Sequence, residues 1–329
     1  MTDLVKNIAD LKKHIAIDFI SGFEVLEYAV EDRENQLKNK YIGAELWAKL
    51  IQAYTPSSTS SSSSSGAVDY SRVLWFAQRI IANFALLDYI PEGQLDISEN
   101  GIRITTSDSK KQAFPWQIEK LEKKYNDTAN SNIEALLNYL NDNIDLFTEW
   151  TNSPAYVFNK GNFINSATEF TKKLSIDNSH RLFIELLPDI NYVEDFYLRS
   201  VLGDEFYNEL KERIKDGEDV DGSSSTSSSS SSGTQDDEYD KVFHLIKGAV
   251  ANYTGFEAAE KIGSDPEKCE KKAEHYVQRL VEFLNNNASA SLFKHYFESN
   301  KYTAPEESES YTSGGGIDNS EFTGVFGAF

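Results

Sequence analysis

The sequence has few residues of the kinds that build covalent or catalytic centres. It contains one cysteine, Cys269, and one methionine in 329 residues. A single cysteine cannot form an internal disulfide, and a chain of this length buries enough apolar surface to fold without one. The sequence has no run of about 18 apolar residues and no signal-peptide pattern at its start, so we expect no membrane association. These absences favour folding inside the cell.

Basic residues are scarce relative to acidic ones. The chain has 32 Lys and Arg against 53 Asp and Glu, which gives a net charge of -21. Proteins that bind DNA or RNA through phosphate contacts need a basic patch, and anionic membranes repel an acidic surface. The composition therefore argues against a sequence-reading nucleic-acid binder and against a membrane-surface protein.

Signatures of catalysis are also missing. The sequence has no G-x-x-x-x-G-K-[ST] phosphate loop, no G-x-G-x-x-G after a strand and no H-E-x-x-H motif. The histidines are not spaced as metal pairs, and the acidic loop at 216–222 misses the register of a calcium loop. Cys269 lies in a Lys/Glu-rich segment, which is typical of a surface thiol. We therefore predict no enzymatic activity, no cofactor and no metal site.

The second half of the chain repeats the first. A glycine, an aromatic residue four positions later and a leucine three positions after that occur at 43–50 and again at 203–210. Beyond a serine tract in each half, a short apolar segment with a central asparagine at 81–84 recurs at 250–253. The repeat signature comprises Gly43, Trp47, Leu50, Asn83, Gly203, Tyr207, Leu210 and Asn252. Repetition in one constant order predicts a tandem duplication of one structural unit.

Helical spacing dominates each half. The pattern predicts helices near 44–54, 69–90 and 130–143 in the first half, and near 237–261 and 267–287 in the second. Gly43 and Gly203 are predicted to form corners between helices. Asn83 and Asn252 are expected to bond a neighbouring backbone group, and the exchange of Trp75 for His244 predicts a packing position. The fold class is therefore all-α, with two tandemly duplicated helical-bundle units.

Three segments depart from this pattern. A stretch at about 92–106 alternates apolar and polar residues around Asn100-Gly101, which predicts a β-hairpin insertion private to the first half. Serine-rich loops occupy 57–66 and 223–233, and their shared decamer is open to explanation by recent copying, selection for a solvated loop, or engineering. We expect a first unit at 1–158, a second at 159–300, and a flexible acidic tail at 301–329.

The tail ends in an apolar set on an otherwise polar segment. Its members are Phe322, Val325, Phe326 and Phe329. Exposed aromatic residues at the end of a chain favour docking onto a neighbouring protein. The alternatives are a disordered tail and a tail folded back on its own subunit.

Residues 236–253 resemble the central helix of the head–tail connector (adaptor) proteins of tailed bacteriophages. The likeness lies in an acidic start followed by Leu245, Ile246 and Ala249. The segments 187–190 and 202–210 resemble proteins from structural gene clusters of Bacteroidetes phages and prophages. The resemblance covers about 181–260, and 23–90 through the repeat, whereas such adaptors usually carry one unit.

This resemblance implies a structural virion protein of the phage neck, assembled in the host cytoplasm. It implies a homo-oligomeric ring, typically twelvefold, that binds the portal and neighbouring tail proteins and forms part of the channel for DNA exit. An acidic lumen would let a duplex pass without sticking, so we expect acids rather than Lys or Arg to line it. The alternatives are an intracellular helical scaffold or peptide-binding module, and an enzyme that uses carboxylate pairs.

Overall fold

The computed structural model describes residues 2–16, 22–54, 68–93, 95–98, 101–104, 114–215 and 235–304. Both serine-rich loops lie outside these residues. The chain from 305 onward also lies outside them, including the four docking candidates Phe322, Val325, Phe326 and Phe329.

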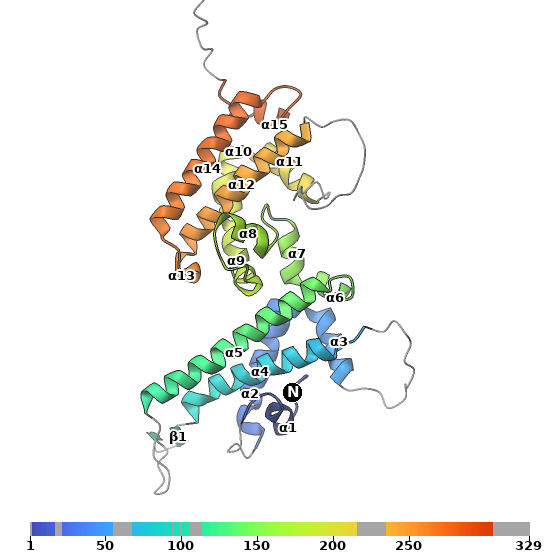
Figure 1. The fold of residues 1–329 in the computed structure, drawn as a ribbon, viewed down its shortest axis with the longest axis vertical. Coiled ribbons are helices and arrows are strands. Elements are labelled where there is room, and N and C mark those ends of the chain that lie inside the picture. Colours follow the sequence, from blue (N-terminus) through green and yellow to red (C-terminus); the bar gives the residue numbers. More distant parts are fainter. Residues whose placement is uncertain are drawn as a thin grey trace, which may run out of the picture.

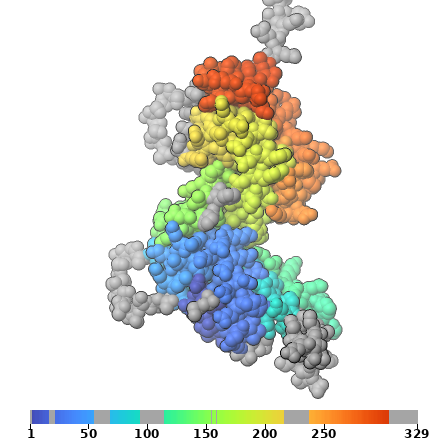
Figure 2. All heavy atoms as spheres, turned by 180° about the vertical axis from the view of Figure 1, so that it is seen from behind, coloured from blue at the N-terminus to red at the C-terminus, as the bar shows by residue number. Residues whose placement is uncertain are grey.

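The described chain is mostly helical and elongated, with the second half stacked on the first along the long axis (Figures 1 and 2). The first half contains α1 (Ile8–Lys12), α2 (Glu24–Leu37), the π-helix η1 (Lys38–Ile42), α3 (Ala44–Tyr54), α4 (Ser71–Glu92), β1 (Leu95–Ser98), β2 (Gly101–Ile104), α5 (Pro115–Asp142) and α6 (Thr148–Thr151). Helix α7 (Pro154–Lys160) connects the halves. The second half contains α8 (Ala167–Lys173), α9 (His180–Val193), the π-helix η2 (Glu194–Leu198), α10 (Arg199–Leu202), α11 (Asp204–Lys215), α12 (Gln235–Glu257), α13 (Ala259–Ile262), α14 (Pro266–Asn287) and α15 (Lys294–Phe297).

Each half has its own hydrophobic core. In the first, α4 is the central helix and packs against α2, α3 and α5. In the second, α12 is central and packs against α8, α9 and α14. Ile184 on α9 packs against both cores, so it lies where the halves meet.

Helix α4 is long and apolar enough, by length and composition alone, to cross a membrane. Its apolar residues are nevertheless used inside the protein. Val73, Ile81 and Ala85 are fully buried in the first core. This packing accounts for the apolar character of α4 as the central helix of a bundle.

The two glycines of the repeat signature lie at corners between helices. Gly43 has φ 84° and ψ 162°, and Gly203 has φ 79° and ψ 155°. Almost only glycine adopts this backbone conformation, because a side chain would clash with the chain. Each glycine carbonyl accepts a bond from the helix that follows, at Trp47 N (3.1 Å) and Tyr207 N (3.0 Å). The predicted glycine corners are confirmed.

Residues 95–104 contain two short strands. β1 and β2 pair in antiparallel fashion, with Leu95 opposite Ile104 and Ser98 opposite Gly101. The pair leaves the end of α4 and precedes α5 (Figure 1). Asn100, expected in the turn, lies outside the described residues.

The structure corrects three sequence predictions. Helix α5 begins at Pro115 rather than near 130, because proline at the first helical position and a run of Lys, Glu and Gln favour helix even where few residues are buried. Cys269 is buried, not a surface thiol. Trp75 is 44% exposed and His244 is also exposed, so this pair lies on the surface rather than in a packed core.

Candidate functional site at the junction of the two halves

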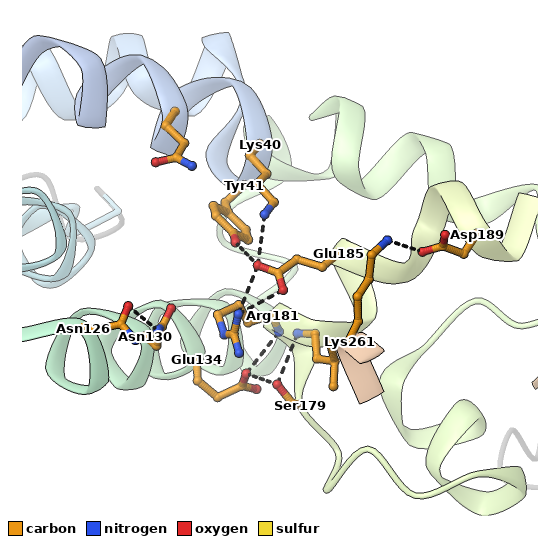
Figure 3. A network of polar contacts seen from close by, with 12 residues as sticks. Lys40, Tyr41, Asn126, Asn130, Glu134, Ser179, Arg181, Glu185, Asp189 and Lys261 are labelled. Atoms are coloured by element: carbon orange, nitrogen blue, oxygen red, sulfur yellow. Dashed lines mark hydrogen bonds and ion pairs between the residues drawn. The ribbon is translucent and has the colours of Figure 1, made fainter. Parts of the chain in front are cut away.

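The two halves meet around the carboxylate of Glu185 on α9. Its Oε1 accepts hydrogen bonds from Nζ of Lys40 (3.0 Å) and from the hydroxyl of Tyr41 (3.1 Å), both on η1. Arg181, one turn earlier on α9, donates from Nη1 to both oxygens of Glu185 at 3.0 Å. Figure 3 shows the three donors converging on this carboxylate. The cluster therefore ties η1 of the first half to α9 of the second.

The charges around Glu185 favour its ionised form. Burial alone would raise its pKa, but the hydrogen bond and charge of Lys40 and the charge of Arg181 outweigh burial, so the pKa lies below the ordinary value. Burial and the charge of Glu185 raise the pKa of Tyr41. Glu185 is therefore an anion and Tyr41 a neutral donor near neutral pH. Charge-assisted bonds of this kind orient their partners strongly.

A carboxylate of the first half caps the N-terminus of α9. Glu134 on α5 accepts from Oγ of Ser179 (2.8 Å), N of His180 (2.7 Å) and N of Arg181 (3.0 Å). Ser179 is the N-cap of α9 and also accepts from the backbone N of Leu182. The first N–H groups of a helix lack intrahelical partners, and the helix dipole favours negative charge there. The first half thus supplies part of the cap for a helix of the second.

An open cleft of about 760 Å³ lies beside this joint. Its walls include Trp150, Phe183, and the pair formed by Asn141 Nδ2 and His180 Nδ1 at 2.8 Å. Burial lowers the pKa of His180, so its neutral ring accepts the amide hydrogen. Within the described part of the chain, no group of three or more His, Cys, Asp or Glu side chains is placed to hold a metal. The arrangement joins helices of the two halves.

A surface aromatic cluster lies on the second half. Tyr192 and Phe196 stack with ring centroids 5.3 Å apart, and they are 48% and 60% exposed. Tyr197 touches both rings edge-on and stacks on Tyr253 at 4.2 Å. The hydroxyl of Tyr197 donates to Glu257 at 2.6 Å, which fixes its ring. Exposed aromatic groups held in place in this way suit a protein contact.

A basic surface lies where α8, α12 and α14 come together. Two adjoining clefts, of about 680 and 580 Å³, share Lys173 and Arg279. Their other basic side chains are Lys172, Lys241, Lys247, Lys268, Lys271 and Lys272. The acidic side chains in the same walls are Glu169, Asp240, Asp265 and Glu267. This is a local excess of positive charge on a chain whose net charge is -21.

The basic residues of this surface influence one another. Burial, together with the nearby charge of Lys247, lowers the pKa of Lys173. Lys247 is buried and donates to Glu169 Oε1 at 2.6 Å. Burial and the charges of Lys173 and Arg279 lower the pKa of His244. The field of this surface therefore favours anions, in contrast to the net negative charge of the chain.

Comparison with known proteins gives a family match. The model of a family of unknown function (DUF6712) matches residues 39–160 and 266–306. The matched residues, just under half of the chain, run from η1 through α7 and then from α14 past α15. No curated protein and no solved structure matches the chain.

The repeat-signature residues all lie in the two cores or at the glycine corners. Trp47, Leu50, Tyr207 and Leu210 are buried, with at most 3% of any of them exposed. Asn83 and Asn252 are buried in α4 and α12. Their Nδ2 atoms donate to the carbonyls four residues earlier, Arg79 O (2.7 Å) and Gly248 O (2.8 Å). The predicted backbone bonds of the asparagines are confirmed.

Sequence reasoning missed a pair of buried glutamates. Glu34 accepts backbone N–H groups from Leu4 (2.8 Å) and Val5 (3.0 Å). Glu194, 160 residues further along the chain, accepts the backbone N–H of Phe163 (2.8 Å) and pairs with Lys211. Burial raises the pKa of Glu194 to about 7, although Lys211 and the backbone bond act in the opposite direction. The sequence did contain a signal for this pair: Glu34 and Glu194 are separated by 160 residues, the same separation as Gly43 and Gly203.

Proposed function

We propose that the chain is a non-catalytic structural subunit of the head–tail connector of a tailed bacteriophage, located in the virion. In this proposal it forms a homo-oligomeric ring, twelvefold by resemblance, that binds the portal and neighbouring neck proteins around the DNA exit channel. The observation that carries it is the junction, where hydrogen bonds from η1 and from α5 join the first half to α9 of the second.

The proposal treats the two halves as tandem copies of one helical unit, with the strand pair β1–β2 as an insertion in the first. Recurring geometry supports this. Each half has a π-helical turn shortly before a glycine of positive φ. Each buries a glutamate, Glu34 or Glu194, that accepts N–H groups of the chain start of its own half. These bonds recur at equivalent positions although the neighbouring side chains differ.

A third equivalence comes from short helices at the start of each half. Asp10 on α1 and Glu169 on α8 are both buried. Asp10 Oδ2 accepts from Lys6 N at 3.2 Å, and Glu169 Oε2 accepts from Asn165 N at 3.3 Å. The two amides are separated along the sequence by the same spacing as the two acids, so the acid–amide pairs occupy equivalent places. These shared features support a common origin of the two halves by duplication.

The contact between the halves is heterologous. The first half contributes η1 and α5, whereas the second contributes the first two turns of α9. A heterologous contact leaves each unit with one unused face, and its repetition between chains generates rings or filaments. This property supports a role as a ring subunit.

The charge distribution supports a channel lined by acids. A chain with a net charge of -21 repels a DNA duplex on average. The basic clefts of α8, α12 and α14 would then face a protein neighbour rather than the lumen. The tail aromatics Phe322, Val325, Phe326 and Phe329 remain proposed docking groups for an adjacent subunit or ring.

Electron microscopy of the chain mixed with its portal protein tests this function. We expect a closed ring on the portal with Asp and Glu lining the central opening. A ring with a basic lumen contradicts the channel mechanism. Failure of the chain to associate with the portal, together with a gene neighbourhood that lacks portal, capsid and terminase genes, contradicts the function.

The alternative is an intracellular scaffold or peptide-binding module. The basic clefts favour it, because their charge and apolar floor at Phe243 and Phe283 suit an acidic peptide. This function predicts a monomer that binds an acidic fluorescent peptide with an affinity that falls steeply in salt. Equal binding of a peptide with its acids replaced by amides contradicts it.

A further inference from the structure

We infer that copies of the chain assemble by repeating the contact that joins its own two halves. The face of α2 that carries Val25 and Tyr28 would receive the end of η2 and α10, at Ser200 and Val201, from a second copy. This inference rests on the proposed function and names the surfaces that build the ring.

The first step is to define the internal contact. On the second half it uses one stripe of α9, formed by His180, Arg181, Ile184 and Glu185. On the first half it uses Lys40, Tyr41, Glu134 and Asn141, from η1 and α5. The two faces share no residue positions, so the contact is not self-complementary.

The second step finds the α9 stripe on the first half. In the register that pairs Gly43 with Gly203, Glu185 corresponds to Val25 and Pro188 to Tyr28, both on α2. Val25 and Tyr28 are each 46% exposed. They are large side chains on a solvent face, and Glu185, the equivalent of Val25, contacts the other half. The hydroxyl of Tyr28 donates to Glu92, which holds the ring in one orientation.

The third step finds the η1 face on the second half. Lys40 corresponds to Ser200 and Tyr41 to Val201. Ser200 is exposed and Val201 is half-buried, whereas Tyr41 at the junction is 4% exposed. In the register that aligns 137–143 with 281–287, the position equivalent to Glu134 is Gln278 on α14, which is also exposed. This face therefore lies open on the described fold.

The start of α2 fits the same contact. Helix α9 has the Ser179 cap and the Glu134 carboxylate from the first half. The N-cap of α2 is Phe23, and in the described structure it makes no side-chain capping bond. If the internal contact is repeated between copies, the side-chain amide oxygen of Gln278 from a second copy lies where Glu134 lies at α9, and it would accept the free N–H groups at the start of α2.

The contact between copies differs in chemistry from the one within the chain. The internal pair Lys40–Glu185 is ionic, with 3.0 Å between Nζ and Oε1. The equivalent pair between copies, Ser200 and Val25, is uncharged. This pair therefore contributes no ionic attraction, unlike a contact made through the basic clefts.

The arrangement of the halves is compatible with repetition. In Figure 1, α1 and α15 lie at opposite ends of the described fold. The second half stands on the first, so its free face lies on the side of the molecule where a further unit would continue the series. Whether the series closes into a ring depends on the rotation at each contact.

Crosslinking tests the pairing directly. Val25→Cys and Ser200→Cys are combined in one chain and treated with a short bismaleimide crosslinker, alone and on the portal. We expect a ladder of covalent oligomers. The matched control replaces Val25→Cys by Leu121→Cys, because Leu121 is 40% exposed and lies on α5 outside the proposed face. Wild type, with buried Cys269, gives the background.

Val25→Asp gives a second, independent readout. We expect wild-type circular dichroism and melting temperature but a loss of assembly of tenfold or more, with Leu121→Asp assembling normally. Two outcomes overturn the inference and leave the proposed function intact: equal ladders from both cysteine pairs, or normal assembly of Val25→Asp under conditions where the wild type forms rings. A wild type that forms no oligomer on the portal overturns both.

Discussion

The carboxylate of Glu134 accepts a hydrogen bond from the backbone N–H of His180 at 2.7 Å, although the two residues belong to different halves, each with its own hydrophobic core. The acid lies on α5 of the first half, and the amide opens α9 of the second. A helix whose cap comes from another unit is oriented by that unit. This bond therefore helps to set how the second half is oriented on the first.

Replacing Glu134 by alanine should weaken the junction. The variant Glu134→Ala leaves Ser179 as the only side-chain cap seen at the start of α9. We expect a loss of about 1–2 kcal/mol in the free energy of unfolding, the usual size for a lost cap. Urea denaturation followed by circular dichroism measures it. The exposed Glu119→Ala on the same helix is the control, and an equal loss there would contradict a capping role.

Alanine at either glycine corner should be destabilising. At Gly43 and Gly203 the backbone has φ 84° and φ 79°, so Gly43→Ala and Gly203→Ala should each cost about 1–3 kcal/mol. The control is Gly161→Ala, because Gly161 has φ -90° and no atom within 4 Å of an added Cβ. Thermal unfolding measures all three. A corner variant as stable as Gly161→Ala would show that the positive φ is not required.

The junction should weaken in acid. The pKa of Glu185 is lowered, against the effect of burial, by Lys40 and Arg181 from an ordinary value of 4.5. A lowered pKa in the folded state gives stability that is present above pH 4.5 and is lost as the pH falls through the folded-state pKa. Glu185→Gln should therefore lose roughly 1–3 kcal/mol near neutral pH. The difference from wild type should shrink as the pH is lowered, and a difference that is constant with pH would contradict this role.

Removal of Lys211 should leave the buried Glu194 without its cationic partner. Glu194 is 1% exposed and pairs with Lys211, so Lys211→Met leaves it without its cationic partner. We expect a loss of about 1–3 kcal/mol in the free energy of unfolding at mildly alkaline pH, where wild-type Glu194 is ionised, measured by urea denaturation. Lys271→Met on α14 is the control, since Lys271 has 77% of its side chain exposed. A loss at Lys211 no larger than that of the control would show that the pair contributes little.

The same variant has a pH signature. Burial raises the pKa of Glu194 to about 7, so the folded chain retains a proton that the unfolded chain releases above 4.5. Stability from this group falls as the pH rises between those values. Without Lys211 the folded-state pKa rises further, so the decline should extend to higher pH. Titration of unfolding free energy from acid to mildly alkaline pH would contradict this if both proteins gave parallel curves.

Much of the helical framework could be predicted from apolar spacing. The predicted helix at 44–54 matches α3, and the segment predicted near 267–287 matches α14. The early part of α5 was missed because its helix rests on propensity and a proline start rather than on a buried stripe. Cys269 was predicted at the surface because its neighbours are charged. It lies four residues before buried Ala273, on the same face of α14, and is therefore buried.

The surfaces were harder to predict. The junction brings together Lys40, Glu134 and Glu185, which share no periodic pattern and come from three separate helices. The basic clefts likewise combine side chains of α8, α12 and α14, while the overall composition indicates only acidity. The four tail residues Phe322, Val325, Phe326 and Phe329 lie beyond the described part of the chain. Their docking stays a prediction.

Electron microscopy of the full chain assembled on its portal, at a resolution that separates helices, tests the central claim most directly. The account predicts a closed ring in which α2 of each copy, at Val25, meets Ser200 of the next, with acidic residues facing the channel. A monomer bound singly, or a ring whose channel is lined by Lys173, Lys272 and Arg279, would contradict it.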